Sequence, residues 1–136
     1  MQEPLLKTTN LVKSFPVRQG FFGKKQFLMA VDGVNLTINK GETLGMVGES
    51  GCGKSTLGLT IMRLYEPTSG SVLIEGQDIT VLDSVELRKA RRQMQMIFQD
   101  PFASLDPRMT VENILREPLD IHEIGTPAER SAEVHR

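Results

Sequence analysis

The sequence predicts an α/β fold in which short strands and helices alternate around a glycine-rich loop. Residues 34–38 alternate apolar and polar side chains, the pattern of a strand with one face in water. Residues 43–47 are mostly apolar, as in a strand buried on both faces. Residues 54–65 carry apolar side chains at helical spacing, and residues 71–74 form a further apolar run. This succession of strand, strand, helix and strand is typical of an α/β protein.

The N-terminal segment predicts one more strand and a loop. Residues 5–15 mix apolar and polar side chains as a half-buried strand does. Residues 16–25 contain two Gly, one Pro and three basic residues, a composition that predicts an exposed loop. We expect Phe21 and Phe22, which lie inside this loop, to pack back onto the domain.

The second half of the chain predicts short helices joined by irregular segments. Residues 85–93 are expected to form a very basic helix, and residues 94–98 a strand. Residues 100–108 contain two Pro and predict a loop, after which residues 110–116 form a short helix. The basic helix has two interpretations: a solvated helix face, or a surface attracted to anionic lipid headgroups.

A last helix begins near the end of the chain. Thr126 and Glu129 have the spacing of a capping box, with Pro127 at the first helical position. A domain seldom ends a few residues into a newly capped helix, so we expect the chain to be a fragment. The alternative is that this helix is simply the C-terminal one.

Composition excludes several classes of function. The 136 residues are 39% hydrophobic and 24% charged, which is ordinary for a globular domain. Lys plus Arg number 16 against 17 for Asp plus Glu, so nothing favours a nucleic-acid partner. No apolar run approaches the ~20 residues that cross a bilayer, and the N-terminus has no signal-peptide pattern. A single cysteine fits a reducing cytosol.

The glycine-rich loop matches the phosphate-binding pattern G-x-x-x-x-G-K-[ST] over residues 48–55. Its context fits as well, because a predicted buried strand precedes it and a predicted helix follows. Closely spaced phosphate charges can be surrounded by backbone N–H groups only if the chain curls tightly, which the glycines permit. The residues expected to contact the phosphates are Gly48, Glu49, Ser50, Gly51, Cys52, Gly53, Lys54, Ser55 and Thr56.

Three side chains of this loop have distinct expected roles. Lys54 should reach the β- and γ-phosphates as a point charge, and so contribute to catalysis. The Ser55 hydroxyl should bind Mg²⁺, and Thr56 can donate to the α-phosphate. Cys52 is either an inert small residue or a thiol activated by the helix terminus and Lys54. The sequence therefore predicts a site for ATP and Mg²⁺.

Three stretches together resemble the ATPase subunits of ABC transporters. Residues 11–15 resemble the A-loop, in which an aromatic residue, here Phe15, stacks on adenine; a core position for Phe15 is the alternative. Residues 96–101 resemble the Q-loop, whose glutamine, here Gln99, touches Mg²⁺ and the attacking water. Residues 99–111 look like the peptide-importer branch, and residues 15–17 with the basic insertion that follows resemble its second ATPase subunit.

The resemblance covers almost the whole chain and implies a specific fold and set of partners. The implied fold is a P-loop NTPase core of the ABC ATPase type, with an antiparallel β subdomain and an incomplete parallel sheet. The implied partners are transmembrane permease subunits, a second ATPase subunit in a homo- or heterodimer and, indirectly, a periplasmic or lipid-anchored solute-binding protein. The implied location is cytoplasmic, on the inner face of the cell membrane.

Residues 1–136 match only the N-terminal part of one such domain. The signature motif, the Walker B acids and the H-loop are absent. We therefore expect an ATP-hydrolysing parent that imports peptides or related small solutes, and a fragment that is inactive by itself. The alternatives are another P-loop enzyme, such as a kinase or GTPase, and a non-catalytic nucleotide-binding fragment.

Overall fold

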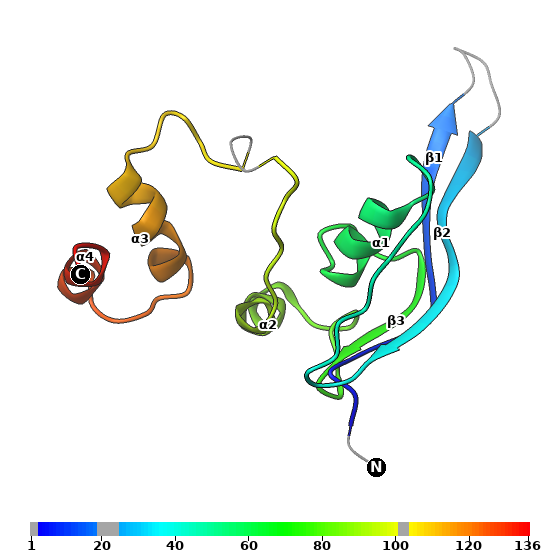
Figure 1. The fold of residues 1–136 in the computed structure, drawn as a ribbon, viewed down its shortest axis with the longest axis horizontal. Coiled ribbons are helices and arrows are strands. Elements are labelled where there is room, and N and C mark those ends of the chain that lie inside the picture. Colours follow the sequence, from blue (N-terminus) through cyan, green and yellow to red (C-terminus); the bar gives the residue numbers. More distant parts are fainter. Residues whose placement is uncertain (1–2, 19–24, 101–103) are drawn as a thin grey trace. The chain divides into compact units, whose positions relative to one another are not determined.

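The computed structural model describes residues 3–18, 25–100 and 104–136. They divide into two compact units, residues 1–83 and 84–136, and each is described by itself. The first contains an antiparallel sheet and an α-helix, and the second contains short α-helices and a 3₁₀ turn (Figure 1). Among the helices that the structure describes, none is both long and apolar enough to cross a bilayer.

The first unit is built on an antiparallel sheet. Its strands are β1 (Leu6–Arg18), β2 (Lys25–Ile38), β3 (Ser69–Ile74) and β4 (Gln77–Asp78). Their order across the sheet is β2-β1-β3-β4, and every pairing is antiparallel. The predicted strands at 5–15, 34–38 and 71–74 are confirmed, whereas β4 was not predicted.

The helix α1 (Lys54–Ile61) lies against β1 and β2 (Figure 1). Apolar side chains from the sheet and the helix make up the buried core between them. The buried apolar residues of this unit are Leu6, Leu11, Val31, Leu57, Val72 and Ile79. Thr8 is also buried, and its hydroxyl donates to the Val34 carbonyl and accepts from the Leu36 N–H, both at 3.0 Å. Because both hydrogen bonds are made, this polar group can remain inside the core.

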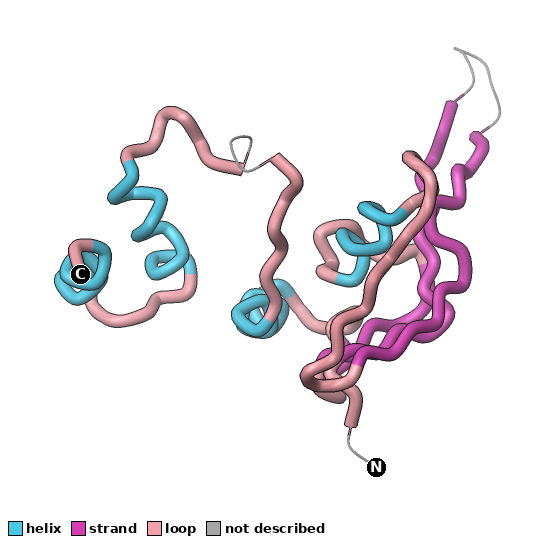
Figure 2. Tube along the Cα trace, viewed as in Figure 1, coloured by secondary structure: helices cyan, strands magenta, loops and turns pink. Residues whose placement is uncertain are grey.

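Two of the predicted strands are wrong. Residues 43–47 and 94–98 have no regular secondary structure, and Figure 2 shows both segments as loop. The Val47 side chain is 98% exposed and that of Ile97 is 95% exposed, the opposite of burial. A strand is stabilised by hydrogen bonds to neighbouring strands, and no described segment of this chain pairs with either one. The apolar pattern alone therefore does not produce a strand.

The predicted loop at 16–25 is shorter than expected. Pro16 to Arg18 belong to β1 and pair with Lys25 to Phe27 of β2, so the two strands extend into the predicted loop. The central residues 19–24, with Phe21 and Phe22, lie outside the described part of the chain. The prediction that these two rings pack on the domain therefore remains untested.

The second unit contains α2 (Ser84–Ala90), the 3₁₀ turn η1 (Arg91–Gln93), α3 (Val111–Ile121) and α4 (Pro127–Val134). The basic helix and the two later helices are confirmed. The Thr126 hydroxyl accepts from the Glu129 N–H while the Glu129 carboxylate accepts from the Thr126 N–H, which is the predicted capping box. Residues 104–108 are loop, as predicted, and 101–103 lie outside the described residues.

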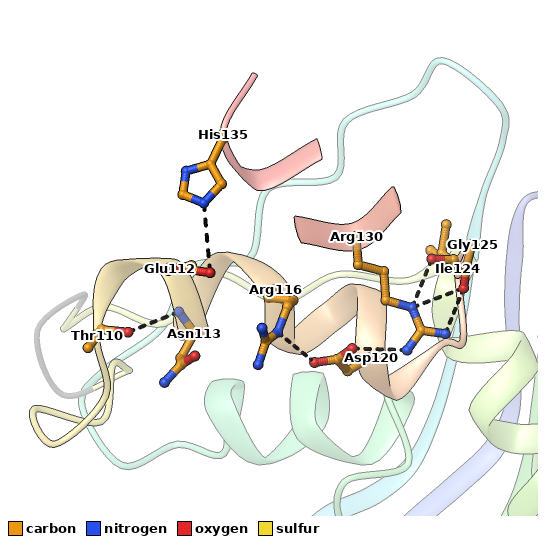
Figure 3. Close-up of polar contacts among 9 residues, drawn as sticks. All are labelled: Thr110, Glu112, Asn113, Arg116, Asp120, Ile124, Gly125, Arg130 and His135. Carbon is orange, nitrogen blue, oxygen red and sulfur yellow. Dashed lines mark hydrogen bonds and ion pairs between the residues drawn. The ribbon is translucent and has the colours of Figure 1, made fainter. Parts of the chain in front are cut away.

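Arg130 ties the turn between α3 and α4 together. Its side chain is 15% exposed, and the guanidinium donates to the Asp120 carboxylate at 2.9 Å and to the carbonyl oxygens of Ile124 and Gly125 (Figure 3). Arg116 donates to the other oxygen of Asp120 at 3.2 Å. The hydrogen bond from Arg130, with a smaller contribution from Arg116, holds the pKa of Asp120 below its ordinary value.

We expect acid to loosen this helix pair through Asp120. A carboxylate with a lowered pKa in the folded state stabilises the fold above its unfolded pKa, and this stabilisation is lost as the pH falls. Helical content measured by far-UV circular dichroism should therefore fall as the pH drops below about 4. Asp120→Asn should be less helical already at neutral pH and change less on acidification.

The matched control for that experiment is Glu117→Gln. Glu117 is exposed on the same helix and forms no ion pair with the residues that the structure describes. This variant should follow the wild-type acid transition. An Asp120→Asn variant with an unchanged acid transition would contradict the assignment.

Candidate nucleotide-binding site

The glycine-rich loop leads directly into α1. Residues 48 and 49 are irregular, residues 50–53 turn and bend, and Lys54 is the first helical residue. The Cys52 N–H donates to the Glu49 carbonyl at 3.3 Å, and the first helical hydrogen bond runs from the Leu57 N–H to the Gly53 carbonyl at 2.8 Å. The predicted arrangement of loop and helix is thus present, although the segment that precedes the loop is not a strand.

Gly53 permits a close approach of the loop to β2. Its φ is 97°, and a Cβ built on it would lie 2.3 Å from the Ala30 carbonyl oxygen. Any side chain here would strain the backbone and also collide with a neighbouring strand. The loop can therefore sit against β2 only with glycine at this position.

The Lys54 side chain folds back over the loop. Its Nζ donates to the carbonyl oxygens of Gly48 and Glu49, each at 2.6 Å, and lies 3.5 Å from the Cys52 sulfur. The ammonium is therefore held inside the curl by neutral acceptors, and no carboxylate of the described residues forms an ion pair with it. A phosphate oxygen is a stronger, charged acceptor for such a group. The arrangement suits the capture of an anion.

The start of α1 adds a second source of positive potential. The N–H groups of a helix's first turn have no partner within the helix, and the helix dipole is positive at that end. The first turn of α1 holds no acidic residue. Ser55 is exposed and Thr56 half-buried, so both hydroxyls lie at the helix end that such a ligand would approach.

A cavity of about 390 Å³ opens beside the loop. Its walls are mainly apolar residues from β2, the segment before the loop and α1. The lining residues are Met29, Ala30, Val31, Asp32, Val34, Met46, Val47, Cys52, Gly53, Lys54 and Leu57. The loop and its lysine thus border a hollow with a mostly apolar lining.

Phe15 lies on β1 and is half-buried. It pairs with Leu28 of β2. Leu28 lies two residues before Ala30, whose carbonyl oxygen the loop approaches at Gly53. Phe15 and the loop are therefore placed near the same part of β2. Its ring contacts the Tyr65 ring in an edge-to-face arrangement, with centroids 5.4 Å apart. The Phe15 ring therefore packs against Tyr65 and still exposes part of its surface to solvent.

Gln99 is exposed and lies in the irregular segment of the second unit. Since the two units are described separately, its predicted role beside the phosphates remains a prediction. The described residues contain no group of three or more His, Cys, Asp or Glu side chains that could hold a metal ion. The Ser55 hydroxyl, exposed at the start of α1, is an oxygen of the kind that Mg²⁺ takes as a ligand.

Sequence reasoning missed the contact of Phe15 with Tyr65 and Lys13. The Lys13 Nζ lies 4.9 Å from the Phe15 ring centroid and 5.8 Å from that of Tyr65. Tyr65 is the only tyrosine of the chain and lies just beyond the end of α1. Its aromatic ring at that position was the only sequence feature that could have indicated the contact. Its placement against β1 depends on the tertiary packing of α1 on the sheet, which the hydrophobic pattern of the sequence does not reveal.

The chain belongs to the ABC transporter family, whose profile matches residues 31–136. Its structure has the fold of an ATP-binding cassette with an antiparallel β subdomain. It resembles a cassette solved as a dimer in a post-hydrolysis state bound to ADP and Pi, with a TM-score of 0.73 and 31% identity. That match covers 95% of this chain and 53% of the other.

Similar curated proteins come from Bacillus subtilis. The oligopeptide transport ATP-binding protein AppF is 52% identical over 135 residues, which cover 98% of this chain. The putative oligopeptide transport ATP-binding protein YkfD is 52% identical over 121 residues, covering 89% of this chain. The chain spans 41% of the first relative and 35% of the second.

Proposed function

We propose that this chain is the nucleotide-binding, N-terminal part of one ATPase domain, in a subunit that couples ATP hydrolysis to the import of peptides or related small solutes. The observation that carries the proposal is the Lys54 ammonium, held over the loop at 2.6 Å from two carbonyl oxygens at the start of α1. Family membership argues against the kinase and GTPase alternatives.

In the proposed site the loop grips the triphosphate. The N–H groups of residues 48–56 surround the β-phosphate, and Lys54 leaves the loop carbonyls to bridge the β- and γ-phosphates. Phe15 stacks on adenine. Ser55 and Gln99 would hold Mg²⁺, which when bound neutralises phosphate charge, and Gln99 orients the attacking water.

The peptide-importer assignment is supported by two findings. The run 99–111 resembles that branch, and the curated relatives carry oligopeptide transport in their names. On this proposal the complete subunit pairs with a second ATPase subunit and with transmembrane permease subunits at the inner face of the cell membrane. A solute-binding protein would act through the permease, and nucleic acid has no part.

A Mg-ATP titration of the complete subunit tests the proposal. We expect the amide resonances of residues 46–57 to shift, and Lys54→Ala to weaken binding by roughly 10- to 100-fold. The reason is that a hydrogen bond to a charged group is worth about 1.5–3 kcal/mol, and each 1.4 kcal/mol is tenfold in affinity. Lys40→Ala, which removes an exposed lysine paired with Glu75, should bind ATP as the wild type does.

The 136-residue chain by itself should bind nucleotide weakly and hydrolyse none, because it lacks the Walker B acids and the signature motif. Steady-state ATP turnover by this chain, lost in Lys54→Ala, would contradict that part of the proposal. Unmoved resonances of the loop in the complete subunit at saturating Mg-ATP would overturn the nucleotide site itself.

A further inference from the structure

Phe15 on β1 and Tyr65 in the turn after α1 form a pair of aromatic rings in the first unit. Their ring planes stand at 84° with centroids 5.4 Å apart, an arrangement that the opposite charges of ring faces and ring edges favour. Phe15 is half-buried, and Tyr65 is 40% exposed. The pair is therefore an ordered contact at the surface, where a ligand can reach it.

The turn that carries Tyr65 is fixed from two sides. The N–H groups of Leu64 and Tyr65 both donate to the Leu59 carbonyl, at 2.8 and 3.1 Å, which closes the end of α1. Arg63, with φ at 51°, donates to the carbonyl oxygens of Ile79 and Leu82 at 2.8 and 2.7 Å. A side chain mounted on such a turn keeps a defined position.

Lys13 closes the same cluster. Its Nζ donates to the Glu66 carbonyl at 2.7 Å while lying 4.9 Å from the Phe15 ring centroid. The backbone next to Tyr65 therefore holds the cation that contacts Phe15. Both neighbours of the Phe15 ring depend on the turn after α1.

We infer that Tyr65 is a positioning residue for the base of the nucleotide. It fixes the plane of the Phe15 ring, so that a purine can stack without first ordering that ring. The inference rests on the proposed stacking of adenine on Phe15. On this inference both ends of α1 serve the nucleotide. The phosphate loop precedes its first residue, and the turn after its last residue carries Tyr65, which supports the base site.

The consequence is a selective effect on the base. Removing the Tyr65 ring should weaken the binding of ligands that contain a base and leave the binding of a bare polyphosphate unchanged. Tyr65→Leu removes the ring, Tyr65→Phe keeps it, and Phe15→Leu removes the stacking surface itself. Dissociation constants for Mg-ATP and for inorganic tripolyphosphate with Mg²⁺ would be measured by calorimetry on the complete subunit.

We expect Tyr65→Leu to weaken Mg-ATP binding by about 3- to 10-fold with tripolyphosphate binding unchanged, because an aromatic pair of this geometry contributes at that scale. Tyr65→Phe should lie within about twofold of the wild type, since the ring carries the contact. Adding Tyr65→Leu to Phe15→Leu should cost nothing further, because the ring that it positions is already gone.

Each other outcome is decisive. Equal losses for ATP and tripolyphosphate in Tyr65→Leu would mean that Tyr65 only supports the fold, and would overturn the inference. A loss of ATP binding in Phe15→Leu but none in Tyr65→Leu would overturn the inference alone. Unchanged ATP binding in Phe15→Leu would overturn the proposed adenine contact, and the inference with it.

Discussion

Alanine at Gly53 is expected to weaken Mg-ATP binding by the complete subunit about 100-fold or more. The left-handed backbone costs a residue with a Cβ about 1–2 kcal/mol. The Cβ would also stand 2.3 Å from the Ala30 carbonyl oxygen, a backbone atom that cannot rotate away. Relieving such an overlap costs about 1–3 kcal/mol more, and it moves the loop away from the conformation that grips phosphate.

Gly51→Ala is the matched control for this prediction. Gly51 also has a positive φ, of 82°, but apart from its chain neighbours no atom of the described residues lies within 4 Å of the position that a Cβ would take. This variant therefore carries the backbone strain without the collision, and should weaken binding only about tenfold. Equal dissociation constants for the two alanine variants, measured by calorimetry, would show that the approach of the loop to β2 plays no part in binding.

Gly70→Ala is expected to destabilise the first unit by about 3 kcal/mol or more. Gly70 lies in β3 with φ at 87°, and its Cβ would meet three backbone atoms of Asn10 and Leu11 in β1 at 2.3–2.7 Å. All three atoms belong to the β1 backbone, so no side chain can rotate away to relieve the overlap. The strands β1 and β3 must therefore separate. Leu11 and Val72, both fully buried on these strands, would then lose their packing.

Hydrogen exchange in the complete subunit measures this effect locally. Amides of β1 and β3 should exchange much faster in Gly70→Ala, while those of α3 and α4 keep their wild-type rates. Gly41→Ala is the control, because Gly41 has φ at 77° and its Cβ would meet no atom within 4 Å in the described part of the chain beyond its two neighbours. It should cost only about 1–2 kcal/mol. Wild-type protection of β1 in Gly70→Ala would disprove the predicted collision.

The parts of the fold that the sequence predicts well are those with local causes. The capping box of α4 is set by Thr126 and Glu129, three positions apart, and the structure contains both of its hydrogen bonds. The loop before α1 is similar, since its glycines and Lys54 lie within one short stretch. In both cases the interacting groups are neighbours along the chain, so their spacing is enough.

The mispredicted strands have a non-local cause. Residues 43–47 and 94–98 carry the composition of buried strands, yet in this structure they are exposed and without strand pairing. Strand formation requires hydrogen-bonding neighbours that can lie anywhere in the sequence. A pattern of apolar side chains therefore indicates the tendency to form a strand but does not supply the partner.

The sequence by itself determined the phosphate loop and the capping box of α4, because each depends on residues close together in the chain. Only the tertiary structure decided that Gly53 rests on the Ala30 carbonyl and that Tyr65 meets Phe15. These contacts depend on the register of β1 against β2 and on how α1 lies across them, which the packing of the buried core sets.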